Sequence, residues 1–379
     1  MDTTLGQDAV NIAQDLIRID TTNTGGADSV GEREAAEYVL GQLQDLGYQP
    51  HYIESEPRRG SLLLRLEGVD SSRPALVLHG HLDVVPANRT EWSDDPFGAE
   101  IKDGELWGRG AVDMKGMDGM ILAVLRHWQA RGVKPPRDLI VAFFADEEAG
   151  GKLGSHWLVT QHPEWFHGAT EAVGEVGGFS VEVAGKRAYL LQTAEKGIAW
   201  LRLVAQGTPG HGSAVNSDNA VEHLVEALAA IAAHPWPLEL TPTVRALLQG
   251  VAQLVDIPAD LEDPAIVDQL IQALGPAQRF VGASIRTGAN LTSLQAGSKV
   301  NVVPLHASAT VDFRPLPGCG SQVIAQVEQL AGSRVKVEII NDDVGLEAPI
   351  EVPLVDAMRR AVQAADPGAF TLPYMLAGG

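Results

Sequence analysis

A helix flanked by short apolar runs limits the fold of this chain more than any other feature of its sequence. The runs are "SLLLRL" (61–66), "ALVLHG" (75–80) and "DLIVAFFA" (138–145), and each is typical of a strand buried on both faces. Between the last two lies "MDGMILAVLRHWQARG" (117–132), whose apolar residues recur at helical spacing. A strand, a helix and a second strand in this order form a crossover that brings both strand ends to one edge of a sheet. We therefore expect an α/β domain with a largely parallel sheet.

A second pattern, β-α-β-β-α-β, begins near residue 197 and is the order of a ferredoxin-like fold. A mostly helical insertion at about 238–285 interrupts this pattern. We expect the smaller α+β domain to comprise residues 196–342 and to be inserted into an α/β domain formed by residues 1–195 and 343–379. A chain of 379 residues is long enough for two domains of this size.

Composition and charge disfavour several classes of partner. No run of about 18 apolar residues is present, and the start of the chain lacks the cationic and then apolar pattern of a signal peptide. The single cysteine, Cys319, cannot form an internal disulfide, which is typical of a cytoplasmic protein. A net charge of −21 disfavours nucleic acid and anionic membranes as partners, because phosphates attract Lys and Arg.

Four short stretches place side chains that bind metals at the ends of predicted elements. They are "HLD" with His81 and Asp83, "GAVDMKG" with Asp113, "ADEEAGG" with Glu147 and Glu148, and "GEVGG" with Glu175. Each stretch alone also has an ordinary structural interpretation. An aspartate before a helix commonly caps it, and an acidic triplet is commonly a solvated turn.

Together, the four stretches favour a metal centre. Their carboxylates would repel one another at one sheet edge unless cations lay between them. Two divalent cations would balance Asp113, Glu147, Glu148 and Glu175, whereas one would not. An imidazole with carboxylate oxygens and no thiolate suits zinc in a catalytic site that keeps an open position.

The ordered set of motifs resembles the co-catalytic zinc amidohydrolases, the family of aminoacylase, carboxypeptidase G, succinyl-diaminopimelate desuccinylase and acetylornithine deacetylase. The motifs are "GHLDVVP", "GRGAVDMKG", "ADEEAGG", a glutamate after a strand, "GTPGHGS", and "NVVP" followed by "DFRPLPG". The resemblance implies a zinc-exopeptidase-like catalytic domain with a mixed, mainly parallel sheet and helices on both faces. It also implies a ferredoxin-like lid through which two subunits form a homodimer.

The resemblance further implies a set of zinc ligands. His81, Asp113 and Glu175 would bind one zinc, and Asp113 would bridge to a second zinc that Glu148 binds. Cobalt could replace zinc. The family has a cis peptide after the bridging aspartate, so we expect one between Asp113 and Met114.

Two further acidic residues would assist catalysis. Residues two apart in a strand point to the same side, so Asp83 could orient the ring of His81. In the family pattern, Glu147 is the general base. Two zinc ions about 3.5–4 Å apart share a water and lower its pKa. Glu147 would take the proton of this water and pass it to the leaving nitrogen.

Three residues of the inserted domain match family positions as well. His211 in "GTPGHGSAV" would enter the site of the partner subunit and stabilise the oxyanion. Arg314 in "DFRPLPG" would bind the free carboxylate of the substrate with its two-pronged guanidinium, and Asn301 in "KVNVVP" is a weaker candidate for the same task. Without the resemblance, these residues would be interpreted as an exposed loop histidine, a surface arginine and a turn-forming asparagine.

The sequence departs from the family at its C-terminal end. The family takes the last ligand of the second zinc from a histidine that follows a "GGTD"-like turn. This sequence ends in "YMLAGG" and has no histidine after His306. We expect the natural chain to be longer and this chain to have weak activity or none.

The expected function is hydrolysis of an amide or peptide bond next to a free carboxylate, as in carboxypeptidases, dipeptidases and N-acyl-amino-acid deacylases. One alternative is a non-catalytic protein that binds small carboxylates at an incomplete metal site, which the presence of Glu147, a base rather than a ligand, disfavours. Another is a dinuclear zinc aminopeptidase, which the inserted domain and Arg314 disfavour, because an aminopeptidase recognises an amine.

Overall fold

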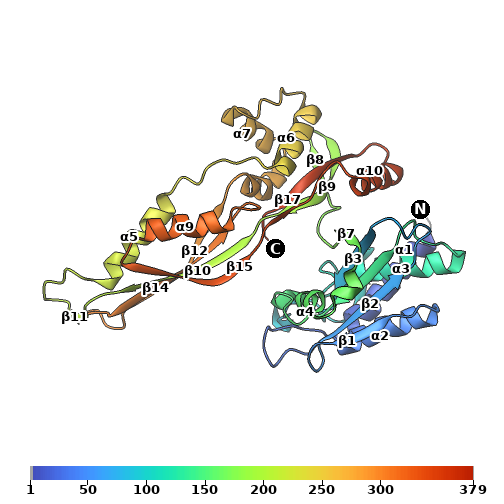
Figure 1. The fold of residues 1–379 in the computed structure, drawn as a ribbon, viewed down its shortest axis with the longest axis horizontal. Coiled ribbons are helices and arrows are strands. Elements are labelled where there is room, and N and C mark those ends of the chain that lie inside the picture. The colour runs from blue at the N-terminus through green and yellow to red at the C-terminus, as the bar shows by residue number, and fades with distance from the viewer. Residues whose placement is uncertain (1–2, 379) are drawn as a thin grey trace. The chain divides into compact units, whose positions relative to one another are not determined.

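The computed structural model describes residues 3–378, and the chain divides into two compact units, Met1–Glu175 and Val176–Gly379 (Figure 1). None of the helices in the described residues is long and apolar enough to cross a membrane.

The first unit is built on one five-stranded sheet. Its helices and strands are α1 (Thr3–Arg18), α2 (Arg33–Asp45), β1 (His51–Glu54), β2 (Gly60–Leu66), β3 (Ala75–His81), β4 (Glu100–Lys102), β5 (Glu105–Trp107), α3 (Lys115–Arg131), β6 (Leu139–Phe144), α4 (Ser155–Gln161) and β7 (Ala169–Val173). The strand order is β1-β2-β6-β3-β7, and β4 and β5 form a separate pair. β3 is parallel to β6 and to β7, so the predicted crossover through α3 is confirmed.

The sheet is mixed, because β2 is antiparallel to both of its neighbours. A mixed sheet is what the resemblance implies, and the direction of "SLLLRL" follows from the length of a connection. Only residues 67–74 join β2 to β3. Parallel strands need a crossover of a dozen or more residues, so β2 runs in the opposite direction to β3.

Helices cover both faces of this sheet. Leu122 of α3 packs in a core with Leu62 and Phe143, to which α1 and α2 also contribute. On the other face, Leu158 of α4 packs with Leu63. Neighbouring residues of a strand point to opposite faces, which is why an uninterrupted apolar run such as that of β2 supplies both cores.

The second unit contains two larger sheets. Its helices and strands are β8 (Ser180–Val183), β9 (Lys186–Glu195), β10 (Ile198–Gln206), β11 (Gly210–His211), α5 (Ala220–Ala233), α6 (Pro242–Val255), α7 (Pro264–Gln272), α8 (Gln278–Val281), β12 (Gly288–Ala296), β13 (Val302–Val303), β14 (His306–Arg314), α9 (Gly320–Ala331), β15 (Val335–Asp343), β16 (Leu346–Glu347), α10 (Pro353–Ala365) and β17 (Phe370–Leu376).

The first of these sheets has the predicted ferredoxin-like arrangement. Its strands lie in the order β12-β14-β10-β15 and all pairs are antiparallel. Leu224 of α5 and Val327 of α9 pack with Leu201 of β10 and Val311 of β14. Both helices therefore cover the same face of the sheet (Figure 1).

The predicted helical insertion corresponds to α6, α7 and α8, and it packs on the second sheet. That sheet has the order β16-β9-β17, with β8 also paired to β9. Leu247 of α6 and Leu270 of α7 share a core with Leu190 of β9 and Leu372 of β17. The division between the units falls after Glu175, whereas the sequence placed boundaries at 195/196 and 342/343. Those boundaries stay a prediction.

Candidate metal centre

Three of the predicted ligands come together in the first unit. His81 ends β3, Asp113 lies in the loop before α3, and Glu175 follows β7. Their ligand atoms all lie within 4.8 Å of one another. His81 Nε2 is 3.0 Å from Asp113 Oδ1 and 3.5 Å from Glu175 Oε1. Because β3 and β7 are parallel neighbours, their carboxyl ends deliver His81 and Glu175 to the same edge of the sheet.

The two adjacent glutamates follow β6, the other parallel neighbour of β3. They form one 3-10 turn, Glu147–Ala149. Glu147 Oε2 lies 3.6 Å from His81 Nε2. Glu148 Oε1 accepts a hydrogen bond from the backbone N–H of Val85 at 3.2 Å. Adjacent side chains of the turn thus point to different partners.

Asp83 is buried and connects His81 to this turn. His81 Nδ1 donates to the backbone oxygen of Asp83 at 3.0 Å and lies 3.4 Å from its Oδ1, so Nε2 faces Asp113 and Glu175. The carboxylate of Asp83 also accepts the backbone N–H of Glu147 at 3.1 Å and that of Glu148 at 3.0 Å. Support of a metal-binding histidine through its second nitrogen is the arrangement expected in such sites.

The electrostatics of the cluster favour a cation. Burial lowers the pKa of His81, but hydrogen bonds to Asp113, Asp83 and Glu175 outweigh it and raise the pKa well above its ordinary value. Burial, and next the repulsion by Asp113, raises the pKa of Glu148 to about 7. Several carboxylates therefore compete for one positive imidazole. A divalent cation relieves that competition, and an imidazole with carboxylate oxygens is a donor set that zinc accepts.

The peptide bond between Asp113 and Met114 is cis, as expected from the resemblance. Met114 also contacts the cluster, because its sulfur accepts the backbone N–H of His81 at 3.0 Å.

The three candidates of the inserted domain lie in the second unit, at two places. His211 is exposed and its Nδ1 lies 2.8 Å from the hydroxyl of Ser213. Asn301 is its neighbour, since the backbone oxygen of Asn301 accepts from Gly212 through the β11–β13 pair. Arg314 lies at the far end of β14 and forms a two-pronged ion pair with Asp312, with Nε 2.8 Å from Oδ1 and Nη2 3.3 Å from Oδ2.

A buried polar group behind Asp83 was not predicted from the sequence. Asn23 donates from Nδ2 to Asp83 Oδ2 at 2.8 Å and to Asp146 Oδ1 at 3.1 Å. Arg59 Nη2 donates to Asn23 Oδ1 at 3.2 Å. The only sequence signal is the polar run "DTTNTGG" (20–26), which by itself predicts a turn.

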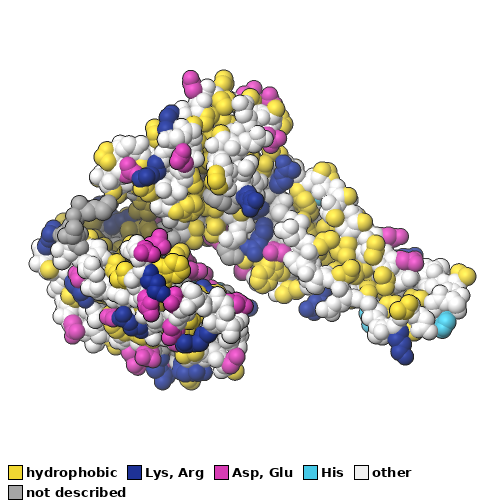
Figure 2. Space-filling model, turned by 180° about the vertical axis from the view of Figure 1, so that it is seen from behind, with side chains coloured by type: hydrophobic (Ala, Val, Ile, Leu, Met, Phe, Trp, Pro, Cys, Tyr) yellow, Lys and Arg dark blue, Asp and Glu magenta, His cyan; other side chains and the backbone are white. Residues whose placement is uncertain are grey.

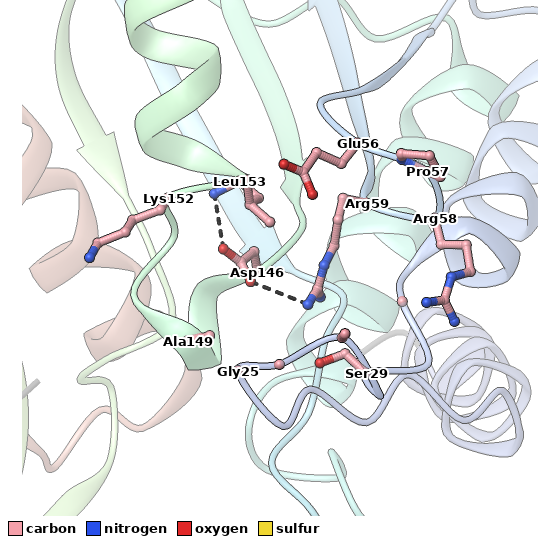
Figure 3. Close-up of a pocket in the computed structure, with 13 residues that line it drawn as sticks. Gly25, Ser29, Glu56, Pro57, Arg58, Arg59, Asp146, Ala149, Lys152 and Leu153 are labelled. Carbon is pink, nitrogen blue, oxygen red and sulfur yellow. Dashed lines mark hydrogen bonds and ion pairs between the residues drawn. The ribbon is translucent and has the colours of Figure 1, made fainter.

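A cavity of about 590 Å³ lies next to this polar group. Figure 3 shows Arg59 reaching across it toward Asp146, with Gly25 and Ser29 below and Leu153 above. Ala149, the last residue of the 3-10 turn, also lines the cavity.

The sequence matches the model of peptidase family M20/M25/M40 over residues 77–378. It is 30% identical over 287 residues to aminoacylase-1 of Sus scrofa, which covers 75% of this chain and 60% of that protein. It is 29% identical over 297 residues to a probable carboxypeptidase S-like 2 of Dictyostelium discoideum, with 74% and 56% covered. It is 28% identical over 323 residues to the N-fatty-acyl-amino acid synthase/hydrolase PM20D1 of Xenopus tropicalis, with 82% and 62% covered. The chain thus spans 56–62% of the length of these relatives.

The fold is similar to solved structures at lower identity. The M20 family metallo-carboxypeptidase Sso-CP2 from Sulfolobus solfataricus matches with a TM-score of 0.70 and 18% identity, covering 100% of this chain and 86% of that one. YXEP of Bacillus subtilis, described as a dinuclear metal binding peptidase, matches with a TM-score of 0.60 and 13% identity, covering 100% and 84%.

Proposed function

Because the chain belongs to peptidase family M20/M25/M40, we propose that it is a metal-dependent hydrolase that cleaves an amide or peptide bond next to a free carboxylate. The observation that carries this proposal is the convergence of His81, Asp113 and Glu175, with Glu147 3.6 Å from the imidazole. A metal site with a carboxylate beside it is the arrangement that metal-assisted hydrolysis needs. Similarity to proteins named as an aminoacylase and a carboxypeptidase supports the choice of bond.

We assign two zinc ions to this centre, with cobalt as a substitute. His81, Asp113 and Glu175 would hold one, and Asp113 and Glu148 would contribute to the second. The support is the donor set, which consists of one imidazole nitrogen and carboxylate oxygens without a thiolate. The similarity in fold to a dinuclear metal binding peptidase agrees with two ions.

The residues around the metals would divide the chemistry among them. A divalent metal bound here supplies a Lewis acid that activates water and polarises the amide carbonyl. Glu147 would accept a proton from the attacking water and deliver it to the leaving nitrogen. Asp83 holds the backbone of Glu147 by a hydrogen bond and faces His81. It would therefore keep Glu147, the base, and His81, the ligand, in fixed positions relative to each other.

The substrate would be a small molecule with a free carboxylate, an N-acyl amino acid or a short peptide. We assign its carboxylate to Arg314, assisted by Asn301, because a guanidinium binds a carboxylate in two-pronged fashion. Arg314 already forms this geometry with Asp312, so the substrate would compete with or extend that ion pair. In a homodimer, His211 of one subunit would stabilise the oxyanion that forms in the site of the other subunit. We place the reaction in the cytoplasm, in keeping with the single cysteine.

The homodimer would form through the ferredoxin-like sheet. Among the described strands, β12 pairs with β14 alone, so its other edge is open. Leu291 and Leu294 of this strand are exposed, and Figure 2 shows hydrophobic side chains on the surface of this part of the second unit. An open, apolar edge strand is a template for pairing with another chain. The unpaired backbone N–H and C=O groups of β12 in one copy would pair with those of β12 in the other copy.

Hydrolysis by the protein loaded with zinc or cobalt tests this function, with N-acyl amino acids and dipeptides as substrates. Glu147→Gln should lower kcat about 10²–10⁴-fold and keep the bound metal, because glutamine has the shape of the base without its proton affinity. Glu164→Gln, which changes an exposed carboxylate of the same unit, should retain the wild-type rate.

Two results would overturn the proposal. One is undiminished turnover by Glu147→Gln. The other is a wild-type protein that binds its metals and these carboxylates but hydrolyses none of the substrates, which would support the non-catalytic alternative.

A further inference from the structure

Asn23 is buried behind the metal centre with its whole side chain engaged. Its amide nitrogen donates to Asp83 and Asp146, as described above. Its oxygen accepts from Arg59 Nη2, from the Ser29 hydroxyl at 3.0 Å and from the backbone N–H of Gly25 at 3.0 Å. An amide offers two donors and one oxygen, so rotation of this side chain would break all of these bonds together.

Arg59 supplies a buried positive charge to the same group. Its Nη1 lies 2.7 Å from Glu32 Oε1, and its Nη2 lies 3.6 Å from Asp146 Oδ1. Glu32 and Asp146 are both buried. A buried carboxylate without a partner is costly, so the guanidinium stabilises both carboxylates in their places.

The two carboxylates beside Asn23 both adjoin the 3-10 turn Glu147–Ala149. Asp146 directly precedes Glu147, has a positive φ of 65° and accepts the backbone N–H of Leu153 at 2.9 Å. Asp83 accepts the backbone N–H groups of Glu147 and Glu148. A displacement of either carboxylate therefore moves the two glutamates.

We propose that Asn23 and Arg59 are positioning residues of the metal centre, which act by holding Asp83 and Asp146 and thereby the turn that carries Glu147 and Glu148. This inference rests on the proposed function. Neither residue touches the reacting atoms, and their effect reaches the base and the ligand through two carboxylates.

The cavity next to Arg59 makes the proposal testable by chemical rescue. Arg59 and Asp146 both line this space of about 590 Å³ (Figure 3). In Arg59→Ala, the space left by the guanidinium would be continuous with the cavity. A free guanidinium ion could then enter and bind between Glu32 and Asp146.

Arg59→Ala should lower kcat and zinc affinity about 10–100-fold, the usual effect of losing an outer partner of a metal site. KM should change far less than kcat. Millimolar guanidinium chloride should restore part of the lost kcat and part of the lost zinc affinity. Arg65→Ala, which removes an ion pair with Asp138 on the same unit, should lose little and should not respond to guanidinium.

Asn23→Asp provides a second, isosteric variant in case Arg59→Ala does not fold. It replaces an N–H donor by an oxygen that faces Asp83 and Asp146, and it leaves the size of the side chain unchanged. Zinc affinity, measured by competition with a chelating dye, should therefore fall. Wild-type kcat and zinc affinity in a folded Asn23→Asp would overturn the proposal, as would an Arg59→Ala protein that is folded and equally active.

The zinc measurement separates this inference from the proposed function. If the wild-type protein binds its metals and hydrolyses none of the amides, the proposed function fails, whereas loss of zinc affinity in Asn23→Asp would still support the positioning role.

Discussion

Lys196 is a buried cation of the second unit, and its burial links stability to pH. Its ammonium group donates to the backbone oxygens of Ala283 at 2.9 Å and Arg286 at 2.8 Å. Burial, and next the charge of Arg314, lowers the pKa of this ammonium from 10.5 to about 8. Between these two pH values the unfolded chain binds the proton that the folded chain has lost. The free energy of unfolding therefore rises with pH in this window.

Lys196→Met should remove that dependence. We expect the free energy of unfolding of the wild type, relative to the variant, to be constant below pH 8 and to rise by up to about 3 kcal/mol by pH 10.5. Urea unfolding at a series of pH values measures the difference. A difference that stays the same across the window would show that the ammonium is not destabilised by its burial.

At the residue scale, the sequence predicted that His81, Asp113 and Glu175 lie together and missed the polar residues behind Asp83. His81, Asp113 and Glu175 each stand beside an element end that the apolar pattern reveals, and parallel strands deliver such ends to one edge. Asn23 lies 60 residues from Asp83 in the sequence and meets it only through folded loops. Local pattern carries no information on such a contact.

At the element scale, Gly154 fixes how α4 follows the 3-10 turn Glu147–Ala149. A Cβ atom at this position would lie 1.6 Å from the backbone oxygen of Ala145, which cannot yield as a side chain would. Gly41 lies within α2 and a Cβ there would meet no atom within 4 Å. The two glycines thus form a matched pair with opposite expectations.

Gly154→Ala should lower the free energy of unfolding by about 3 kcal/mol or more, because β6 or the turn must move to make room. Gly41→Ala should raise it by about 0.5–1 kcal/mol, because alanine is the better helix former. Thermal or urea unfolding of both variants checks the pair. An unchanged stability in Gly154→Ala would mean that the loop shifts freely.

The direction of single strands is what the sequence could not predict at this scale. A continuous apolar run indicates burial but not direction, and β2 and β6 have the same kind of sequence in opposite orientations. The short connection after β2 is what indicates that β2 and β3 run in opposite directions. The helices, by contrast, followed directly from their apolar spacing, as α3 illustrates.

At the scale of the whole molecule, the order of elements predicted the ferredoxin-like sheet but not the partner of its helical insertion. The apolar stripes of α6 and α7 were visible in the sequence, but a stripe does not specify which sheet it will cover. In the structure they cover β9 and β17. β17 comes from near the end of the chain, so the core they share joins segments far apart in sequence.

The open edge of β12 leads to a prediction about assembly. We expect the wild-type protein to sediment as a dimer and Leu294→Glu to sediment as a monomer, because a charge on the pairing strand would be buried between two copies. Val69→Glu changes an even more exposed apolar side chain of the first unit and should leave the dimer intact. A wild-type monomer at all concentrations, or a dimeric Leu294→Glu, would contradict pairing through β12.

The shared hydrogen bonding of Asp83 has a consequence for genetics. Its carboxylate accepts hydrogen bonds from the backbone N–H groups of two glutamates and from the side-chain amide of an asparagine, while its carbonyl oxygen accepts one from an imidazole. A missense allele that replaces Asp83 would disturb several of these hydrogen bonds at once. Its phenotype would exceed that of losing any one of those partners.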